Sequence, residues 1–485
     1  MADDIAFASA TRLARMIARR KIGARELLEL YLARTRALNP ALNAVVVLNA
    51  APARRRADEL DKLTTSRGAR LGPLHGVPMT VKESYDVKGL PTTCGFPAHL
   101  ARRARVDALA VQRLQAAGAV VFGKTNVPVA LADWQSFNPV YGTTNNPWDV
   151  TRVPGGSSGG SAAALAAGLT GLEIGSDIGA SIRNPAHYCG VYGHKPTFGV
   201  ASRQGHGLPS ANPQGDISVI GPLARSAFDL ETALKVIAGP DDADAPGWSV
   251  ALPRSTKRAL SEFRVAVMLT APDADVDSAV QEKLVALAAW LRRQGTRVDM
   301  KARPVDPGQA HRVFITLLRA ATSLGVTDEA FARLQRQRKG LAADDDGYQA
   351  QMIRATTLGH REWLAADRER RQMRDQWAAF FQRFDLLLCP LAATTAFPHN
   401  QQGERWERMI PVNGQPQPST TQMFWAGYSG AFHLPSTAAP LGLAADGLPV
   451  GVQIVGPRYG DLTCLKFAQL LERQYAGFQA PPGFD

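Results

Sequence analysis

Cysteine is scarce in this chain, as are the clusters that usually mark a metal or disulfide site. The 485 residues include only four cysteines, and no two of them form a Cys-x-x-Cys pair. This spacing predicts neither a disulfide framework nor a zinc site. Each thiol is therefore expected to be a small buried hydrophobe (Cys94, Cys189, Cys389 and Cys464). The sequence implies no metal and no cofactor.

Long hydrophobic runs are also missing. The longest, such as residues 386–389, are far too short to cross a bilayer, so no membrane span is expected. The chain starts Met-Ala-Asp-Asp, without a basic stretch that leads into an apolar one, which argues against a secretory signal. We therefore expect a cytoplasmic location.

Acidic side chains are fewer than basic ones. Asp and Glu total 43 against 55 Lys and Arg, which gives a formal net charge of +12. Such an excess can indicate binding to nucleic acid or to anionic membranes, or simply arginine-rich solvated helices. Here the excess is spread over stretches such as 54–56 and 368–371, with acidic residues nearby. Solvated helices are the preferred interpretation, and nucleic acid is not an expected partner.

Helix and strand signals alternate along the chain. Helical periodicity within 8–38 precedes a β-branched run at 44–48, and later strand signals are separated by helical ones. One such helix, at 108–116, is expected to have Asp107 as its N-cap. The further expected elements are strands at 77–82, 118–122, 264–268, 297–300 and 450–455, and a helix at 276–294.

This alternation predicts the fold class. We expect an α/β protein with a mixed, twisted β-sheet core, α-helices on both faces of the sheet, and an embedded, mainly helical lobe. The chain would form one continuous domain in four parts. These are an N-terminal helical segment packed on the core, a core segment, an α/β and helical lobe, and the C-terminal part of the same core (1–70, 71–225, 226–395 and 396–485).

Residues 118–125 match the phosphate-loop pattern G-x-x-x-x-G-K-[ST]. That pattern binds a nucleotide only when its interior is an open loop followed by a helix. Here the interior is Ala-Val-Val-Phe, which favours a buried strand, and Pro128 disfavours a helix after Thr125. Nucleotide binding is therefore not expected.

Residues 155–159 match G-x-S-x-G, the nucleophile elbow of α/β hydrolases. Asp385 and His433 could complete a triad with Ser157, so this alternative stays open. Its weakness is that residues 151–154 do not form the hydrophobic strand that precedes such an elbow.

Three other stretches carry residues suited to catalysis. In 154–168, four glycines and three serines lead into an alanine-rich segment. The glycines allow close backbone approach, and the serines can satisfy the first N–H groups of a helix. A well-capped helix start without a catalytic role is the alternative interpretation.

The second stretch, 175–186, places Ser181 among small residues whose N–H groups can point the same way. Such a run can supply an oxyanion hole, although an ordinary Gly-rich turn has the same composition. The third stretch, 76–83, places Lys82 at the end of an apolar strand. A lysine there must extend outward to solvent, pair with an acid, or be held neutral by burial.

Together these stretches resemble the amidase signature family of serine hydrolases. The separations agree with that family's pattern, with 75 residues from Lys82 to Ser157 and 24 from Ser157 to Ser181. Further segments carry the resemblance in the same order along nearly the whole chain (residues 123–126, 141–148, 193–197 and 447–453). One motif would be weak evidence, but all of them in order make a chance similarity very improbable.

The resemblance implies a Ser–cis-Ser–Lys triad. Ser181 would be the acyl-forming nucleophile, Ser157 the bridging hydroxyl on a cis peptide, and Lys82 the base. A lysine can act as a base near neutral pH only if burial lowers its pKa, and a strand-end position suits that requirement. The oxyanion hole would be formed by backbone N–H groups (Ile178, Gly179, Ala180 and Ser181).

By the same matching, Ser158, Asp177 and Arg183 are expected to hold the loops in place, and no histidine takes part. The chain departs from the family's pattern at two positions. The family commonly has Gly-Gly-Ser where this chain has Ala180 before the serine, so a positive φ there would strain the alanine. It also more often has Asp after the lysine, where this chain has Glu83.

Aromatic residues flank the signature and suggest a substrate class. They are Trp134, Phe137 and Tyr141 before it and Phe424, Trp425, Tyr428 and Phe432 after it. One hypothesis is an apolar acyl pocket that favours aryl or aliphatic hydrophobic amides; the other is that these rings simply form core. The candidate pocket residues are Met79, Trp134, Gln135, Phe424 and Trp425. The expected activity is hydrolysis of a carboxylic amide to an acid and an amine or ammonia.

Two other functions stay open. The family also contains the glutamine-hydrolysing subunit of tRNA-dependent amidotransferases, although residues 432–437 depart from what is expected of that subunit. The alternative of another class is a non-catalytic basic binding protein on an amidase scaffold, which the presence of all three triad residues opposes. The expected partner is a small-molecule amide, and a homodimer is left open.

Overall fold

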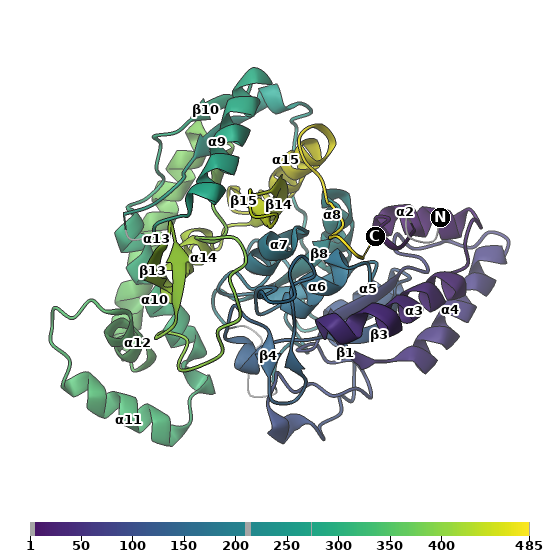
Figure 1. The fold of residues 1–485 in the computed structure, drawn as a ribbon, viewed down its shortest axis with the longest axis horizontal. Helices are drawn as coiled ribbons and strands as arrows, with labels where there is room; N and C mark the ends of the chain where they lie inside the picture. Colours follow the sequence, from purple (N-terminus) through teal and green to yellow (C-terminus); the bar gives the residue numbers. More distant parts are fainter. Residues whose placement is uncertain (1–4, 209–214, 273, 485) are drawn as a thin grey trace.

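The computed structural model describes residues 5–208, 215–272 and 274–484 (Figure 1). Residues 1–4, on which the expectation about a secretory signal rests, lie outside the described residues. No helix in the described part of the chain is both long and apolar enough to cross a membrane.

The N-terminal segment folds into helices around one strand. α2 (Ala10–Ala18) and α3 (Ala24–Leu42) arise from the periodic stretch at 8–38, and their apolar stripes are buried. β1 (Val45–Leu48) and α4 (Ala50–Thr65) follow, as the sequence predicts. In Figure 1 these helices lie together at one side of the molecule.

A three-stranded sheet of order β1-β3-β2 carries Lys82 at the end of its last strand. β2 (Pro78–Lys82) runs parallel to β3 (Val120–Thr125), whereas β1 is antiparallel to β3. Every residue of β2 and β3 is buried. The stretch that matches a phosphate loop is thus largely a buried strand, as its Ala-Val-Val-Phe interior predicts.

The helix between these two strands, α5 (Leu109–Ala116), begins one residue later than predicted. Ala108 is its N-cap, and no side chain caps it. The prediction of Asp107 as N-cap is wrong, because that carboxylate accepts a hydrogen bond from the Lys88 N–H at 2.7 Å instead.

An eight-stranded sheet of order β10-β9-β11-β15-β14-β7-β8-β6 forms the centre of the molecule. β10, β9 and β11 are parallel, and all other neighbours are antiparallel, which confirms the predicted mixed sheet. The strands are β6 (Glu173–Asp177), β7 (Tyr192–Lys195), β8 (Val219–Ala224), β9 (Arg264–Val267), β10 (Arg297–Asp299), β11 (Leu386–Cys389), β14 (Ser436–Leu443) and β15 (Pro449–Val455). Strands from three of the four predicted parts of the chain share this sheet, and the boundaries between those parts stay predictions.

Helices cover the large sheet as the sequence predicts. α6 (Gly159–Ala166) packs against β8, and α7 (Arg183–Cys189) packs against β7 and β14. α8 (Ala227–Ile237) and α15 (Asp461–Gln474) form a second pair that contacts the sheet. α9 (Ser278–Arg293) packs beside β10.

A mainly helical part lies beside the sheet, on the left of Figure 1. Its helices α10, α11, α12 and α13 come from the long charged stretch before β11, and α10 also packs against α14. Their bounds are α10 (Pro307–Thr322), α11 (Asp328–Lys339), α12 (Tyr348–Thr356), α13 (His360–Arg383) and α14 (Met423–Gly430). The remaining short strands are 137–138, 142–143, 409–412 and 415–418. The 3₁₀ turns are 97–99, 129–131, 260–262, 323–325 and 419–422.

Candidate active site

Ser157 lies in the tight turn that leads into α6, and the peptide bond between Gly156 and Ser157 is cis. The turn is closely packed, which explains its glycines. A Cβ added at Gly156 would lie 2.3 Å from the carbonyl oxygen of Asp133, and one at Gly160 would lie 2.3 Å from the backbone nitrogen of Asn126. Side chains larger than hydrogen are therefore excluded at both positions.

The serines of this turn do not cap α6 in the way the sequence suggested. Ser158 is the N-cap residue, but its side chain makes no capping hydrogen bond. The Gly159 N–H instead donates to the hydroxyl of Ser136 at 3.1 Å. Ser158 has a different contact, because its own N–H donates to the carbonyl oxygen of Ser181 at 3.1 Å. Ser158 thus connects the turn before α6 to the loop after β6.

Lys82 is completely buried at the end of β2, with its side chain directed at two hydroxyl groups. Its Nζ donates to the Oγ of Ser157 at 2.6 Å and to the Oγ of Ser176 at 3.0 Å. Burial lowers the pKa of Lys82 to about 7, although the charge of Asp177 acts in the opposite direction. A substantial fraction of this lysine is therefore neutral near pH 7, as a general base requires.

Ser176 is a partner of Lys82 to which the sequence analysis assigned no role. It lies on β6, next to Asp177, and its hydroxyl is buried beside the lysine nitrogen. The only sequence signal was its place in the small-residue stretch Gly-Ser-Asp at 175–177. That stretch does not reveal which side of the strand faces Lys82.

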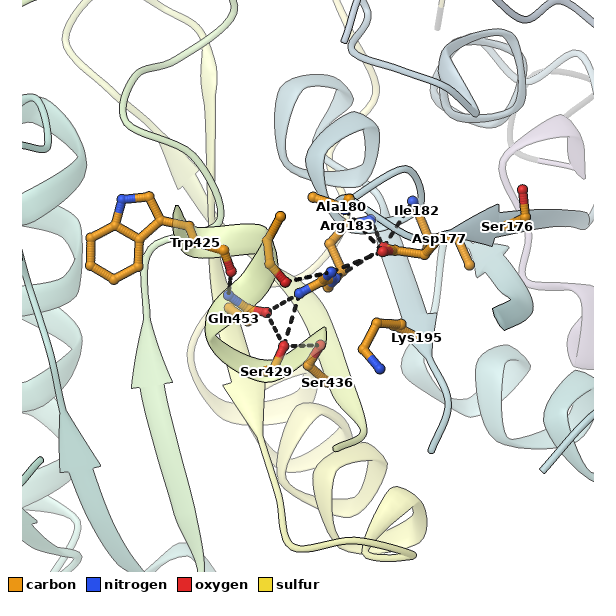
Figure 2. A network of polar contacts seen from close by, with 12 residues as sticks. Ser176, Asp177, Ala180, Ile182, Arg183, Lys195, Trp425, Ser429, Ser436 and Gln453 are labelled. Atoms are coloured by element: carbon orange, nitrogen blue, oxygen red, sulfur yellow. Dashed lines mark hydrogen bonds and ion pairs between the residues drawn. The ribbon is translucent and has the colours of Figure 1, made fainter. Parts of the chain in front are cut away.

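Asp177 holds the loop that carries Ser181. Its carboxylate accepts hydrogen bonds from the backbone N–H groups of Ala180 at 2.9 Å and Ile182 at 3.1 Å (Figure 2). It is also ion-paired with Arg183, whose Nε and Nη2 lie 2.9 and 2.8 Å from it. Burial alone would raise the pKa of Asp177, but the guanidinium and these hydrogen bonds outweigh burial and the pKa is lowered.

Arg183 extends this network to the C-terminal part of the chain. Its Nη1 donates to Ser429 at 2.9 Å and to the side-chain oxygen of Gln453 at 2.5 Å (Figure 2). Gln453 in turn donates to the carbonyl oxygen of Trp425 at 3.1 Å. On these contacts we propose that Asp177 and Arg183 hold the loops in place.

The peptide unit between Gly179 and Ala180 is fixed at both ends by hydrogen bonds, and this limits which N–H groups can form an oxyanion hole. The Gly179 carbonyl accepts from the indole N–H of Trp134 at 2.8 Å, and the next N–H, that of Ala180, is bound to Asp177. In the described part of the chain the N–H groups of Ile178, Gly179 and Ser181 have no acceptor. These three N–H groups are free to bind an oxyanion, whereas the predicted donor Ala180 is already engaged.

Ala180 itself has the strained conformation that the departure from the family's pattern indicated. Its φ is 68°, in the left-handed region that favours glycine. The second departure, Glu83, is accommodated by the backbone. Its carboxylate accepts N–H bonds from Thr93 at 2.6 Å and Cys94 at 2.9 Å and so fixes a loop at the site.

A cavity of about 830 Å³ opens onto these groups. Its walls include Ser157, Ser176, Ser181, Ile178 and Gly179, together with two of the predicted pocket residues, Trp134 and Gln135. The other three predicted pocket residues are in the core and do not line it (Met79, Phe424 and Trp425). Met79 lies within a buried strand, the Phe424 ring contacts His311 of α10, and the Trp425 ring packs against Phe424.

The residues of the alternative nucleophile-elbow triad are not assembled around Ser157. The carboxylate of Asp385 accepts the N–H of Arg264 at 2.7 Å and is ion-paired with the same residue at 3.1 Å. His433 lies 2.8 Å from Asp216. Neither is hydrogen-bonded to Ser157, whose hydroxyl accepts from Lys82 instead, so the geometry does not support this alternative.

The two histidines near the signature in the sequence, His187 and His194, do not line the cavity, whereas His206 does and its ring is hydrogen-bonded to the Ser84 hydroxyl at 3.0 Å. His187 and His194 are buried, and each ring is held by structural hydrogen bonds, His187 to the Gly451 N–H and His194 to Thr437 and Asp461. Among the residues that the structure describes, no three His, Cys, Asp or Glu side chains come together as metal ligands.

Comparisons with known proteins identify the family of this chain. The amidase family model matches residues 26–465. The chain is 34% identical to the indoleacetamide hydrolase of Bradyrhizobium diazoefficiens, over 93% of this chain and 84% of that protein. It is 32% identical to a glutamyl-tRNA(Gln) amidotransferase subunit of Acidothermus cellulolyticus, over 97% of this chain and 95% of that protein.

A solved structure has the same fold over nearly its whole length. It comes from a vestigial protein complex described as revealing the evolutionary origins of an s-triazine catabolic enzyme. The TM-score is 0.82 at 30% identity, with 97% of this chain and 100% of that chain covered. The family model and these similarities together show that the chain belongs to the amidase signature family, whose members hydrolyse amide C–N bonds.

Proposed function

We propose that this protein hydrolyses a carboxylic amide through an acyl-enzyme on Ser181, with Ser157 and Lys82 as a proton relay. The observation that carries the proposal is the 2.6 Å hydrogen bond between the Nζ of Lys82 and the Oγ of Ser157 in a fully buried environment. A lysine whose pKa is about 7 can accept a proton at neutral pH, which an ordinary solvated lysine cannot do.

The relay works in two directions. When the Oγ of Ser181 attacks the amide carbon, its proton passes to Ser157 while the Ser157 proton passes to Lys82. Lys82 then returns a proton through Ser157 to the departing amine, and the C–N bond breaks. A water molecule then attacks the acyl group by the same proton route and releases the acid. The free N–H groups of Ile178, Gly179 and Ser181 stabilise the negative charge on the carbonyl oxygen.

The substrate class that we propose is an aryl or aliphatic hydrophobic amide. Support comes from the wall around the reacting groups, where Trp134, Ile178 and Met423 face the cavity. Met423 lies close to the loop, since a Cβ added at Gly179 would be 3.4 Å from its Cε. The similarity to an enzyme named indoleacetamide hydrolase points the same way.

The experiment is labelling with a fluorophosphonate serine probe, followed by peptide mass spectrometry. We expect the label on Ser181, its loss in Ser181→Ala, and much weaker labelling in Ser157→Ala and Lys82→Ala. Ser161→Ala is a matched control, because this serine lies in the same region but its hydroxyl is bonded to Thr125 at 2.9 Å. Labelling of Ser157 would contradict the assignment, and no labelling together with no amide turnover would favour a non-catalytic binding protein.

A second candidate is the glutamine-hydrolysing subunit of a tRNA-dependent amidotransferase. The observation that favours it is the 32% identity to a subunit of such an enzyme over almost the full length of both chains. The test is to measure ammonia release from glutamine and from hydrophobic amides by the isolated chain. Faster hydrolysis of glutamine, with copurifying companion proteins, would favour this role; turnover of hydrophobic amides by the chain alone would exclude it.

A further inference from the structure

The wall of the cavity that Ser181 lines is strongly basic in part. Five arginines and two aspartates contribute to it (Arg203, Arg319, Arg333, Arg405 and Arg408; Asp133 and Asp216). Both aspartates already have cationic partners. Asp133 is ion-paired with Arg408 at 2.6 Å, and Asp216 with Arg370 at 2.6 Å. The other four arginines of the wall form no ion pair with any residue that the structure describes.

Arg319, on α10, is the most enclosed of these four. Its residue exposure is 9%, and its Nε has no hydrogen-bond partner in the described part of the chain. Its guanidinium donates to the hydroxyl of Tyr348 and lies 5.6 Å from the centre of that ring. A buried guanidinium with only neutral partners is costly, since burial of a charge is compensated mainly by an opposite charge.

Arg405 lies near Arg319 and adds a second positive charge. Its guanidinium donates to the carbonyl oxygen of Ala132, which is again a neutral partner. Burial, and after it the charge of Arg319, lower the pKa of Arg405 and outweigh the opposite effect of Tyr348, Asp133 and Glu404. The two guanidiniums therefore repel each other at this part of the wall, and Asp133, which also lines the cavity, is already bound to Arg408.

These contacts leave a place for an anion. We propose that the amide substrate carries a carboxylate, which binds between Arg319 and Arg405 while the scissile amide lies at Ser181. The inference rests on the proposed function and narrows its substrate class. The Nε of Arg319 would gain the acceptor that it lacks, and one carboxylate would offset the repulsion between the two cations. The apolar residues at Trp134, Ile178 and Met423 would contact the body of the molecule.

The experiment compares matched para-nitroanilides. One series has an acyl chain that ends in a carboxylate, from the succinic to the suberic mono-anilide; the controls end in a methyl group or an ammonium group. A second pair, acetyl-para-aminobenzoate and acetanilide, places the carboxylate on the leaving amine. The carboxylate is thus tested at several chain lengths on the acyl group and once on the leaving amine. For the best of these substrates, we expect kcat/KM to exceed that of its neutral analogue by about 10- to 100-fold, in line with charge-assisted hydrogen bonds.

Variants connect the preference to the two arginines. Arg319→Gln and Arg405→Gln should each reduce the carboxylate-to-neutral ratio of kcat/KM by about tenfold. Arg312→Gln is the matched control, because Arg312 lies on the same helix but is exposed and does not line the cavity. Its ratio should equal that of the wild type. Far-UV circular dichroism and the Tm of each variant identify any that fail to fold.

A wild-type enzyme that hydrolyses the neutral anilides without preferring any carboxylate would overturn this inference and leave the proposed function intact. So would a preference that survives in both variants. Calorimetry with the Ser181→Ala protein gives the same comparison without turnover. If this variant binds no carboxylate anilide more tightly than the neutral analogue, the inference fails even where no amide is hydrolysed. Absence of fluorophosphonate labelling would instead count against the proposed function alone.

Discussion

The Nζ of Lys82 and the Oγ of Ser157 lie 2.6 Å apart, and both side chains are buried. Lys82 ends a strand of the three-stranded sheet, whereas Ser157 precedes a helix that packs on the large sheet. Their contact thus joins two parts of the fold. Burial of the lysine makes its neutral form accessible, which is unfavourable for stability but necessary for a base.

The pH dependence of the reaction follows from this lysine. Lys82 has a pKa of about 7 and accepts a proton only in its neutral form. We therefore expect kcat/KM to rise with pH through a single ionisation near 7 and to fall about tenfold per unit well below it. Initial rates in constant-ionic-strength buffers measure this. A profile that is flat between about pH 5 and 9 would exclude Lys82 as the base.

Replacing the same lysine should separate activity from stability. Lys82→Met is expected to lower kcat by about 10²- to 10⁴-fold and to raise the free energy of unfolding by about 1–3 kcal/mol, because a buried charge is removed. The buried lysine lowers the free energy of unfolding most strongly below pH 7. This effect disappears as pH rises towards 10.5, the pKa of a lysine in the unfolded chain. Urea unfolding should therefore show the advantage of the variant shrinking over that range. An advantage that grows with pH would contradict this.

Ala180→Gly should stabilise the protein. The alanine has a φ of 68°, a region in which glycine lacks the steric penalty of a Cβ. We expect an increase of about 1 kcal/mol in the free energy of unfolding, with the backbone N–H of residue 180 still bound to Asp177. Gly156→Ala is the contrasting variant, since its Cβ would lie 2.3 Å from a carbonyl oxygen. Thermal unfolding measures both, and a loss of stability in Ala180→Gly would be the contrary outcome.

Asp177→Asn should destabilise the protein strongly. It removes the ion pair that the buried Arg183 makes with this carboxylate, and breaking such a pair costs about 3–5 kcal/mol. The lowered pKa of Asp177 means that its stabilising effect is present above the unfolded pKa and is lost as pH falls below about 4. Acid unfolding of the wild type and variant tests this. If the two unfold with the same pH midpoint and the same stability at neutral pH, the pair has no such role.

Several features of the fold and site could be predicted because they depend on local pattern. The strands at Val120 and Val265 and the helix at 278–293 were visible as periodic apolar runs, and the amidase resemblance placed Lys82 and Ser157. These features need no knowledge of long-range packing. Their bounds differ by up to three residues from the prediction, since the strand predicted at 118–122 is Val120–Thr125 and the helix predicted at 276–294 is Ser278–Arg293.

The failures involve contacts between distant segments. Sequence composition suggested that Phe424 and Trp425 line the pocket, but aromatic rings in a core and in a pocket have the same pattern, and α14 turns these two inward. Ser176 as a partner of Lys82, and Arg319 on the cavity wall, depend on how β6 and α10 approach the site. Neither approach is encoded by the spacing of residues along the chain.

Ser181 as the acyl carrier is tested most directly by trapping the acyl-enzyme. A hydrophobic para-nitroanilide is mixed with the enzyme, and the reaction is quenched with acid at intervals. The protein is then digested, and the masses of the peptides are measured by mass spectrometry. We predict an adduct with the mass of the acyl group on the peptide that contains Ser181, absent from Ser181→Ala. An acyl adduct on Ser157, or product formation with no adduct at any quench time, would contradict the mechanism.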